Sequence, residues 1–164
     1  MFTIKAGFSD TVEVRTTIER VRDFFTDIDN FTSMMPGVIA IHTDAQGIMH
    51  WKVEAEIPLV GKMIQKFDVM AEDDDDGRID WGPVPGEQAN FLRFSAEFIE
   101  KAIDRTQVRF LQMVELRRRS ARDLHLLAGL AGESLISREM TARVTEMIRT
   151  FIERAKNKLE SVSN

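Results

Sequence analysis

The 164-residue sequence contains no cysteine and no tyrosine, and it has only four prolines. Without cysteine the chain can form no disulfide, thiolate nucleophile or cysteine-ligated metal site, and it suits a reducing compartment. No apolar run approaches the roughly 20 residues of a membrane-spanning helix, and the N-terminus lacks the charged-then-apolar pattern of a signal peptide. We therefore expect a cytoplasmic protein with no transmembrane segment.

The chain also lacks an excess of positive charge. The chain has 22 Lys and Arg against 27 Asp and Glu, and its net charge of −5 argues against a nucleic-acid partner. The one basic cluster, residues 117–119 with Arg122, fits either a solvated strand end or a contact with an anionic partner. A composition of 43% hydrophobic and 30% charged residues is ordinary for a globular protein. We expect a single domain over residues 1–164.

Signatures of catalysis and of cofactor binding are missing as well. Neither a GxGxxG motif nor a phosphate-binding loop is present, so we expect no nucleotide and no cofactor. His42, His50 and His125 are isolated in the sequence, and no serine has the setting of a nucleophile. We therefore predict no catalytic residue and assign the histidines to surface or structural positions.

One acidic run invites comparison with a calcium loop. Residues 73–76 are all aspartate, and Glu72, Asp74 and Asp76 fall at the first, third and fifth positions of an EF-hand loop, with Gly77 at the sixth. The twelfth loop position should be glutamate, but here it is Pro83. The run therefore predicts a solvated hairpin turn, which also discourages edge-to-edge strand pairing, and no metal site.

A long amphipathic pattern dominates the C-terminal end of the chain. Between residues 134 and 161 apolar residues recur at three- and four-residue spacing, and charged residues occupy the other positions. Ser134 is a candidate N-cap, and Lys156 and Lys158 lie near the negative end of the helix dipole. The pattern predicts one helix roughly 40 Å long.

The preceding chain alternates with a two-residue period, apart from two short helices. The first strand covers residues 2–15, as one piece or as two with a bulge near residues 7–10, and the helices follow over residues 16–27 and 27–37. Further strands are predicted at residues 38–43, 48–57, 62–72, 78–81, 90–100 and 106–117. Their short connections predict an antiparallel meander.

The segment between the last strand and the long helix is predicted as a loop. It spans residues 120–132 and contains four leucines that we expect to pack against the core, namely Leu124, Leu126, Leu127 and Leu130. Together these predictions give an α+β protein whose curved antiparallel sheet of about seven strands wraps around the C-terminal helix.

Three stretches carry a family resemblance. They are residues 21–37, which end in Met-Met-Pro-Gly; residues 53–62, where a strand turns through Pro-Leu-Val-Gly-Lys; and the closing helix. With the order of elements, they make the chain resemble the helix-grip fold of the START-like, or SRPBCC, superfamily, which includes polyketide cyclases and lipid-transfer domains. Within it the chain is most similar to the family of the G subunit of carbon monoxide dehydrogenase. The resemblance implies a cavity between the sheet and the closing helix.

We predict that this cavity binds a hydrophobic or amphipathic small molecule that is lipid-like, quinone-like or polyketide-like. Methionine is abundant, with nine residues, and its flexible side chain suits a tolerant cavity, although it also suits an ordinary core. The residues predicted to line the cavity are Met34, Met35, Trp51, Val53, Gln65, Phe67, Phe94, Phe110, Gln112, Met140, Val144 and Met147.

Two glutamines among these residues are the most informative. Gln65 and Gln112 fall on the inward phases of their strands, and a buried amide is costly unless it is hydrogen-bonded. Each amide therefore serves a ligand or ordered water, or is satisfied within the protein, or turns outward at a break in the register.

Two other functions fit the same resemblance. One is an enzyme of the polyketide cyclase or dehydratase kind, which requires acid–base residues inside the cavity. The other is an accessory protein that docks on a larger redox enzyme or on a membrane through the long helix, as the resemblance to the G subunit of carbon monoxide dehydrogenase implies.

Overall fold

The structure is a computed structural model that describes residues 1–72, 75 and 77–161. In this part of the chain one strand and two short helices are followed by six strands and three helices. In chain order they are β1 (Phe2–Val14), α1 (Ile18–Thr26), α2 (Ile28–Met34), β2 (Val38–Thr43), β3 (Met49–Ile57), β4 (Gly61–Ala71), β5 (Arg78–Pro83), β6 (Asn90–Ala102), β7 (Arg105–Arg118), α3 (Ala121–Leu124), α4 (Ala128–Ala131) and α5 (Glu133–Ser161).

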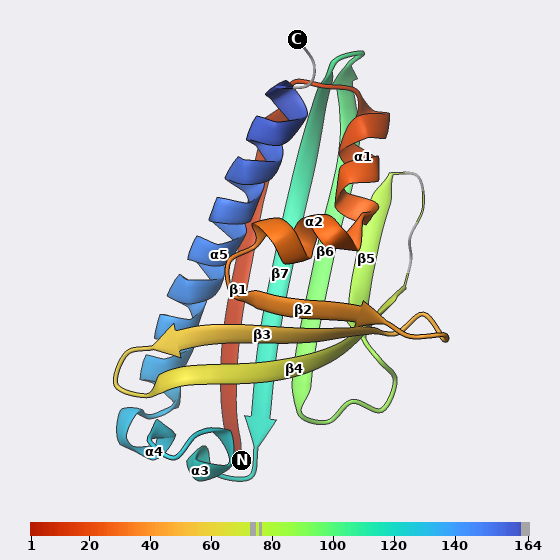
Figure 1. The fold of residues 1–164 in the computed structure, drawn as a ribbon. Helices are drawn as coiled ribbons and strands as arrows, with labels where there is room; N and C mark the ends of the chain where they lie inside the picture. The colour runs from red at the N-terminus through yellow and green to blue at the C-terminus, as the bar shows by residue number, and fades with distance from the viewer. Residues whose placement is uncertain (73–74, 76, 162–164) are drawn as a thin grey trace.

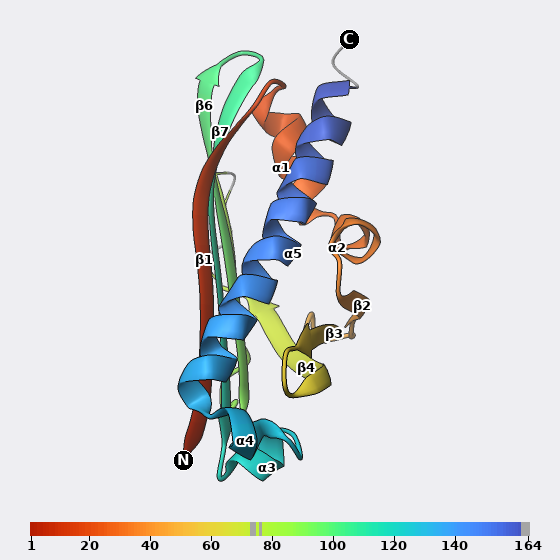
Figure 2. The same cartoon turned by 90° about the vertical axis from the view of Figure 1, so that its left-hand side faces the viewer.

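The seven strands form one antiparallel sheet in the order β1-β7-β6-β5-β4-β3-β2 (Figure 1). β1 pairs with β7 from Phe2 to Val14 without a shift in register, so the first strand is one piece and not two. The hairpin of β3 and β4 crosses the long strands β1, β6 and β7 at a steep angle, which gives the sheet its curvature (Figures 1 and 2). This α+β architecture confirms the predicted helix-grip fold.

Helix α5 lies along the inner side of the curved sheet, on the same side as α1 and α2 (Figure 2). Its buried face carries the apolar residues of the predicted stripe, namely Ile136, Met140, Ile148, Phe151, Ile152, Ala155 and Leu159. The helix begins at Glu133, and the Ile136 N–H already donates to the Gly132 carbonyl at 3.1 Å. The predicted N-cap at Ser134 was therefore wrong, because Ser134 lies inside the first turn.

Helices α1 and α2 close one end of the space between the sheet and α5 with aromatic side chains. Phe31 of α2 is fully buried, with ring centroids 4.7 Å from Phe151 of α5 and 5.3 Å from Phe94 of β6. Phe25 of α1 lies 5.3 Å from Phe110 of β7. Such edge-on and tilted contacts add about 0.5–1.5 kcal/mol per pair beyond the burial of area. This end is therefore a solid core.

The connection from α2 to β2 brings backbone close to α5. Gly37 has a φ of +88°, and a Cβ added there would lie 2.7 Å from the Glu54 carbonyl oxygen and 2.8 Å from the Met147 methyl carbon. Only glycine combines this left-handed backbone with such a close approach. The Pro-Gly pair predicted to end the helix thus also sets the distance between β3 and α5.

The predicted loop over residues 120–132 instead contains the short helices α3 and α4. Leu124 is buried, but Leu126, Leu127 and Leu130 are 76%, 41% and 84% exposed, so the expectation that all four leucines pack inward was wrong. Each helix has only one turn and buries one residue, Leu124 in α3 and Ala128 in α4. The remaining three leucines stay exposed to solvent.

Among the residues that the structure describes, no helix is both long enough and apolar enough to cross a membrane.

Candidate ligand-binding cavity

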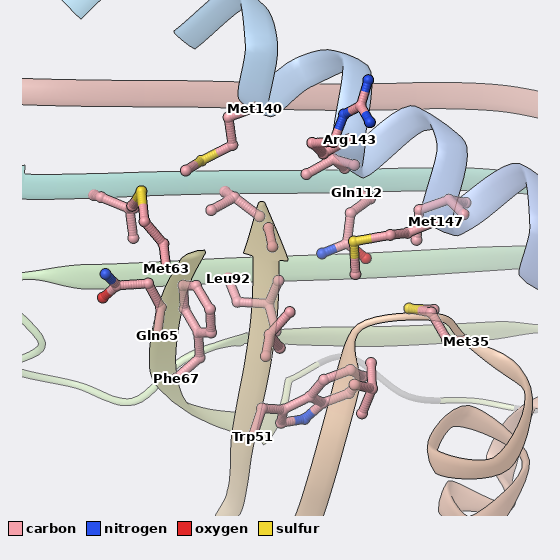
Figure 3. Close-up of a pocket in the computed structure, with 17 residues that line it drawn as sticks. Met35, Trp51, Met63, Gln65, Phe67, Leu92, Gln112, Met140, Arg143 and Met147 are labelled. Carbon is pink, nitrogen blue, oxygen red and sulfur yellow. The ribbon is translucent and has the colours of Figure 1, made fainter. Parts of the chain in front are cut away.

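A mostly apolar cavity separates α5 from the sheet, beyond the solid aromatic end (Figure 3). It is narrow, because the centre of a water-sized molecule can occupy only about 70 Å³ of it. Its walls come from five strands, from α5 and from the segment that links α2 to β2. The lining residues are Met35, Val38, Trp51, Val53, Ala55, Met63, Gln65, Phe67, Leu92, Gln112, Val114, Leu116, Met140, Arg143, Val144, Met147 and Ile148.

The two-residue period of the strands explains why these side chains share one wall. In the β3–β4 hairpin the directly opposed pairs Trp51 and Phe67, Val53 and Gln65, and Ala55 and Met63 all line the cavity. Side chains of one strand that are two residues apart project from the same face of a sheet. β6 and β7 supply a second wall in the same way, through Leu92, Gln112, Val114 and Leu116.

Nine of the twelve residues predicted from the sequence lie around this cavity. They are Met35, Trp51, Val53, Gln65, Phe67, Gln112, Met140, Val144 and Met147. Phe94 and Phe110 do not line it, because they are buried in the aromatic cluster around Phe25 and Phe31. Met34 is the last residue of α2 and does not line it either, and the cavity contact comes from its neighbour Met35.

Gln112 is a buried polar residue in the cavity wall. Its side chain comes from the centre of β7 and points into the cavity (Figure 3), and the residue is only 6% exposed. Within the described part of the chain its amide makes no hydrogen bond, although a glutamine amide offers two donors and one acceptor oxygen. The Gln112 amide thus points into the cavity and has no partner among the described residues.

Gln65 has a different role, although it comes from an equivalent strand position. Its Oε1 accepts a hydrogen bond from Arg118 Nη2 at 2.9 Å and another from Asn90 Nδ2 at 3.2 Å. These bonds tie β4 to the start of β6 and to the end of β7. The oxygen of the Gln65 amide is therefore satisfied by hydrogen bonds within the protein.

Two nitrogen atoms in the cavity lining are also buried without a hydrogen-bond partner. They are Nε1 of Trp51 and Nε of Arg143, both of which are donors. Arg143 also places Nη1 3.3 Å from Glu146, one turn further along α5. The cavity thus combines an apolar wall with unsatisfied donors and one free amide, the chemistry of a site that takes a mostly apolar molecule bearing a polar group.

No aspartate, glutamate or histidine occurs among the lining residues that the structure describes. Arg143 is the charged residue of the lining, and its sequence position at the edge of the apolar stripe did not single it out. Met63, Leu92 and Val114 were also missed, although each continues the inward phase of its strand. The two-residue alternation of each strand is therefore the sequence signal that points to these residues.

The histidines lie outside the cavity. His50 is on the opposite phase of β3 from Trp51, where Nδ1 lies 2.7 Å from Asp68 Oδ1 and Nε2 lies 2.9 Å from Asp44 Oδ2. The hydrogen bonds to Asp44 and then to Asp68 raise the pKa of His50, and the His50 contact lowers the pKa of Asp44. His50 therefore clamps the β2–β3 turn to β4.

The described residues contain no cluster of three or more histidines and carboxylates suited to a metal ion. Of the acidic run considered as a calcium loop, residues 73, 74 and 76 lie outside the described residues. Asp75 belongs to a tight turn, in which its N–H donates to the Arg78 carbonyl at 3.0 Å and its Oδ1 accepts from the Gly77 N–H at 2.7 Å.

Comparison with known proteins gives matches at the level of structure. No family model and no curated protein sequence matches the chain. Among solved structures, the Zhui aromatase/cyclase from Streptomyces sp. R1128 is similar with a TM-score of 0.64 at 11% identity, over 96% of this chain and 98% of that one. A START superfamily protein from Mycobacterium smegmatis is similar with a TM-score of 0.61 at 13% identity, over 93% and 98%.

A third solved structure is the di-domain ARO/CYC BexL from the BE-7585A biosynthetic pathway. It is similar with a TM-score of 0.65 at 17% identity, over 96% of this chain, which spans 50% of the BexL chain. Identities this low demonstrate a shared fold and nothing finer. The chain therefore has the helix-grip fold that the START superfamily protein and the aromatase/cyclases share.

Proposed function

We propose that the protein binds a small amphipathic molecule in the cavity between the sheet and α5, with Gln112 as its polar anchor. The observation that carries the proposal is the amide of the buried residue Gln112, which faces an apolar cavity and has no partner among the described residues. A buried amide without a hydrogen bond destabilises a fold by about 1–3 kcal/mol. A ligand with a hydroxyl, carbonyl or amine group removes that cost when it binds.

The walls favour a ligand that is apolar over most of its surface. Four methionines line the cavity, namely Met35, Met63, Met140 and Met147. Their flexible side chains can rotate to widen a cavity that is narrow when empty. Lipid-like, quinone-like and polyketide-like molecules all have the required chemistry. The aromatase/cyclase names of two structural neighbours support the last of these classes as part of the proposal.

We propose binding in preference to catalysis because of the cavity lining. Acid–base chemistry of the cyclase kind requires a group that exchanges a proton with the bound molecule. The lining residues offer an amide, an indole and a guanidinium, and guanidinium stays protonated. These groups position and polarise a ligand, which is the work of a carrier or a receptor.

Titration with the fluorescent apolar amine N-phenyl-1-naphthylamine tests the proposal. Its emission should rise on binding to the wild-type protein. Ala55→Phe and Val144→Phe place a ring in the cavity from opposite walls and should each reduce affinity at least tenfold. Met113→Phe adds the same ring on β7, where the native side chain is 51% exposed and outside the cavity, and should bind the dye as the wild type does. Equal binding by all four folded proteins would refute the proposal.

A further inference from the structure

Four exposed leucines gather at one end of the molecule. Leu59 lies on the β3–β4 turn and is 73% exposed, and Leu126, Leu127 and Leu130 lie on and between α3 and α4. The β3–β4 turn lies beside α3 and α4 in both views of the fold (Figures 1 and 2), and Leu59 and Leu127 line one groove. We call Leu59, Leu126, Leu127 and Leu130 the leucine face.

Leu59 is held in an unfavourable conformation. Its φ of +70° makes it the one non-glycine residue with positive φ in the described chain. A left-handed backbone crowds the Cβ of an ordinary residue, and glycine or asparagine usually occupies such positions. The exposed side chain gains no burial in return. Neither backbone preference nor core packing thus accounts for leucine here.

The leucine face adjoins the ligand cavity. Its groove is lined by residues 56–61 of the hairpin, by Leu127 and by Arg143. Arg143 also lines the cavity. The groove and the cavity therefore lie on either side of one flexible side chain, and whatever covers the leucine face covers this approach to the cavity.

The segment that carries three of the four leucines is basic, whereas the whole chain is acidic. Residues 117–132 contain four arginines and one aspartate, a net charge of +3 in a chain of net charge −5. Arg119 and Arg122 are exposed and form no ion pair with any residue described by the structure. A second copy of the chain docked by twofold symmetry would bring the same basic patch against itself, which is unfavourable. An anionic surface complements it.

We propose that the leucine face docks on an anionic phospholipid bilayer. The leucines enter the boundary between headgroups and acyl chains while Arg119 and Arg122 contact the phosphates, the pattern of a peripheral membrane contact. The bound protein then presents the groove, Arg143 and the cavity to the membrane. None of the four leucines lines the ligand cavity, so the test of docking needs no ligand and its failure leaves the proposed function standing.

Sedimentation with vesicles tests the proposal. The wild type should bind vesicles of phosphatidylcholine mixed with phosphatidylglycerol, and this binding should weaken with added salt, whereas pure phosphatidylcholine vesicles should bind it at least tenfold more weakly. The double variant Leu126→Ser/Leu130→Ser should lose at least tenfold in affinity. Arg119→Gln/Arg122→Gln should lose about 20- to 30-fold.

Two further variants test whether a loss of binding comes from the leucine face itself and not from unfolding or from a general change in the polarity of the surface. Leu59→Gly removes a leucine while supplying the residue that its backbone favours, so it should weaken vesicle binding without lowering the melting temperature. Lys101→Gln/Ile103→Ser makes matched changes at the β6–β7 turn, where Ile103 is 81% exposed at the opposite end of the molecule (Figure 1), and should bind as the wild type does.

Three results would overturn the proposal. They are absence of binding to anionic vesicles, equal loss of binding in the Lys101/Ile103 control, and equal binding to vesicles without anionic lipid. A dimer that Leu126→Ser/Leu130→Ser disperses, without vesicle binding, would assign the face to self-association instead.

Discussion

Replacement of Gln112 by leucine should stabilise the ligand-free protein. The side chain is 6% exposed on the inward face of β7, and its amide has no hydrogen-bond partner among the described residues. Leucine keeps a similar volume and removes the polar group from the apolar wall. Natural proteins usually lose stability when a buried residue changes, so an increase is a discriminating outcome.

The expected size follows from the cost of an unsatisfied amide. That cost is about 1–3 kcal/mol, and for a chain of this length 1 kcal/mol corresponds to about 2–4 °C in melting temperature. We therefore expect Gln112→Leu to raise the melting temperature by about 2–12 °C. The same change should weaken binding of a ligand with a polar group by about 2- to 12-fold, the contribution of one neutral hydrogen bond.

Gln65→Leu is the matched control, since it removes the same side chain from an equivalent position. The Oε1 of Gln65 accepts hydrogen bonds from Asn90 and Arg118, so this variant should destabilise the protein by about 1–3 kcal/mol. Urea unfolding of both variants without ligand measures the two changes. If Gln112→Leu destabilises the protein as much as Gln65→Leu does, the Gln112 amide is structural and its role as an anchor is refuted.

Three other substitutions test particular features of the fold. His50 has a raised pKa, so the stability that it gives through its two carboxylate partners is fully present below its ordinary pKa of 6.5 and is lost as the pH rises through the raised pKa. The urea midpoints of His50→Asn and the wild type should therefore converge at alkaline pH. A gap between the two midpoints that stays constant with pH would contradict the clamp. Gly37→Ala should cost at least about 1–2 kcal/mol from its left-handed backbone, and thermal melts as stable as wild type would contradict the close approach to the Glu54 carbonyl. Phe31→Ala should cost about 3–5 kcal/mol in urea unfolding, and a loss under 1 kcal/mol would show that the aromatic end is not a packed core.

Much of the fold could be predicted because the helical period of about 3.6 residues and the two-residue period of the strands occupy separate parts of the sequence. The apolar stripe of α5 predicted a helix over residues 134–161, and the observed helix starts one residue earlier. Alternation placed each strand to within about two residues, since a half-buried antiparallel strand must alternate. Helices α3 and α4 were missed because four residues are too few to display a helical period.

The cavity could be predicted only in part. The sequence shows which face of the sheet a strand residue lies on, but it does not show which part of α5 or α2 lies opposite that residue. Phe94 and Gln112 both point inward and are directly opposed in the register. One meets the ring of Phe31, whereas the other meets the cavity. That division depends on where α2 lies against the sheet, a tertiary contact without a local signal.

The different fates of Gln65 and Gln112 have the same origin. Both are inward amides in their strands, and nothing near either one in the sequence distinguishes them. The partners of Gln65 are Asn90 and Arg118, which are 25 and 53 residues away. Hydrogen bonds between side chains at such separations come from the fold as a whole.

The nine methionines permit the most direct test of the cavity. In the methyl NMR spectrum of protein labelled at methionine, N-phenyl-1-naphthylamine should shift the signals of the four methionines that line the cavity. Those are Met35, Met63, Met140 and Met147. The signals of Met1, Met70 and Met113, which lie outside it, should stay in place. Shifts confined to these three, or no shift at the four lining residues at saturating dye, would contradict a ligand site between the sheet and α5.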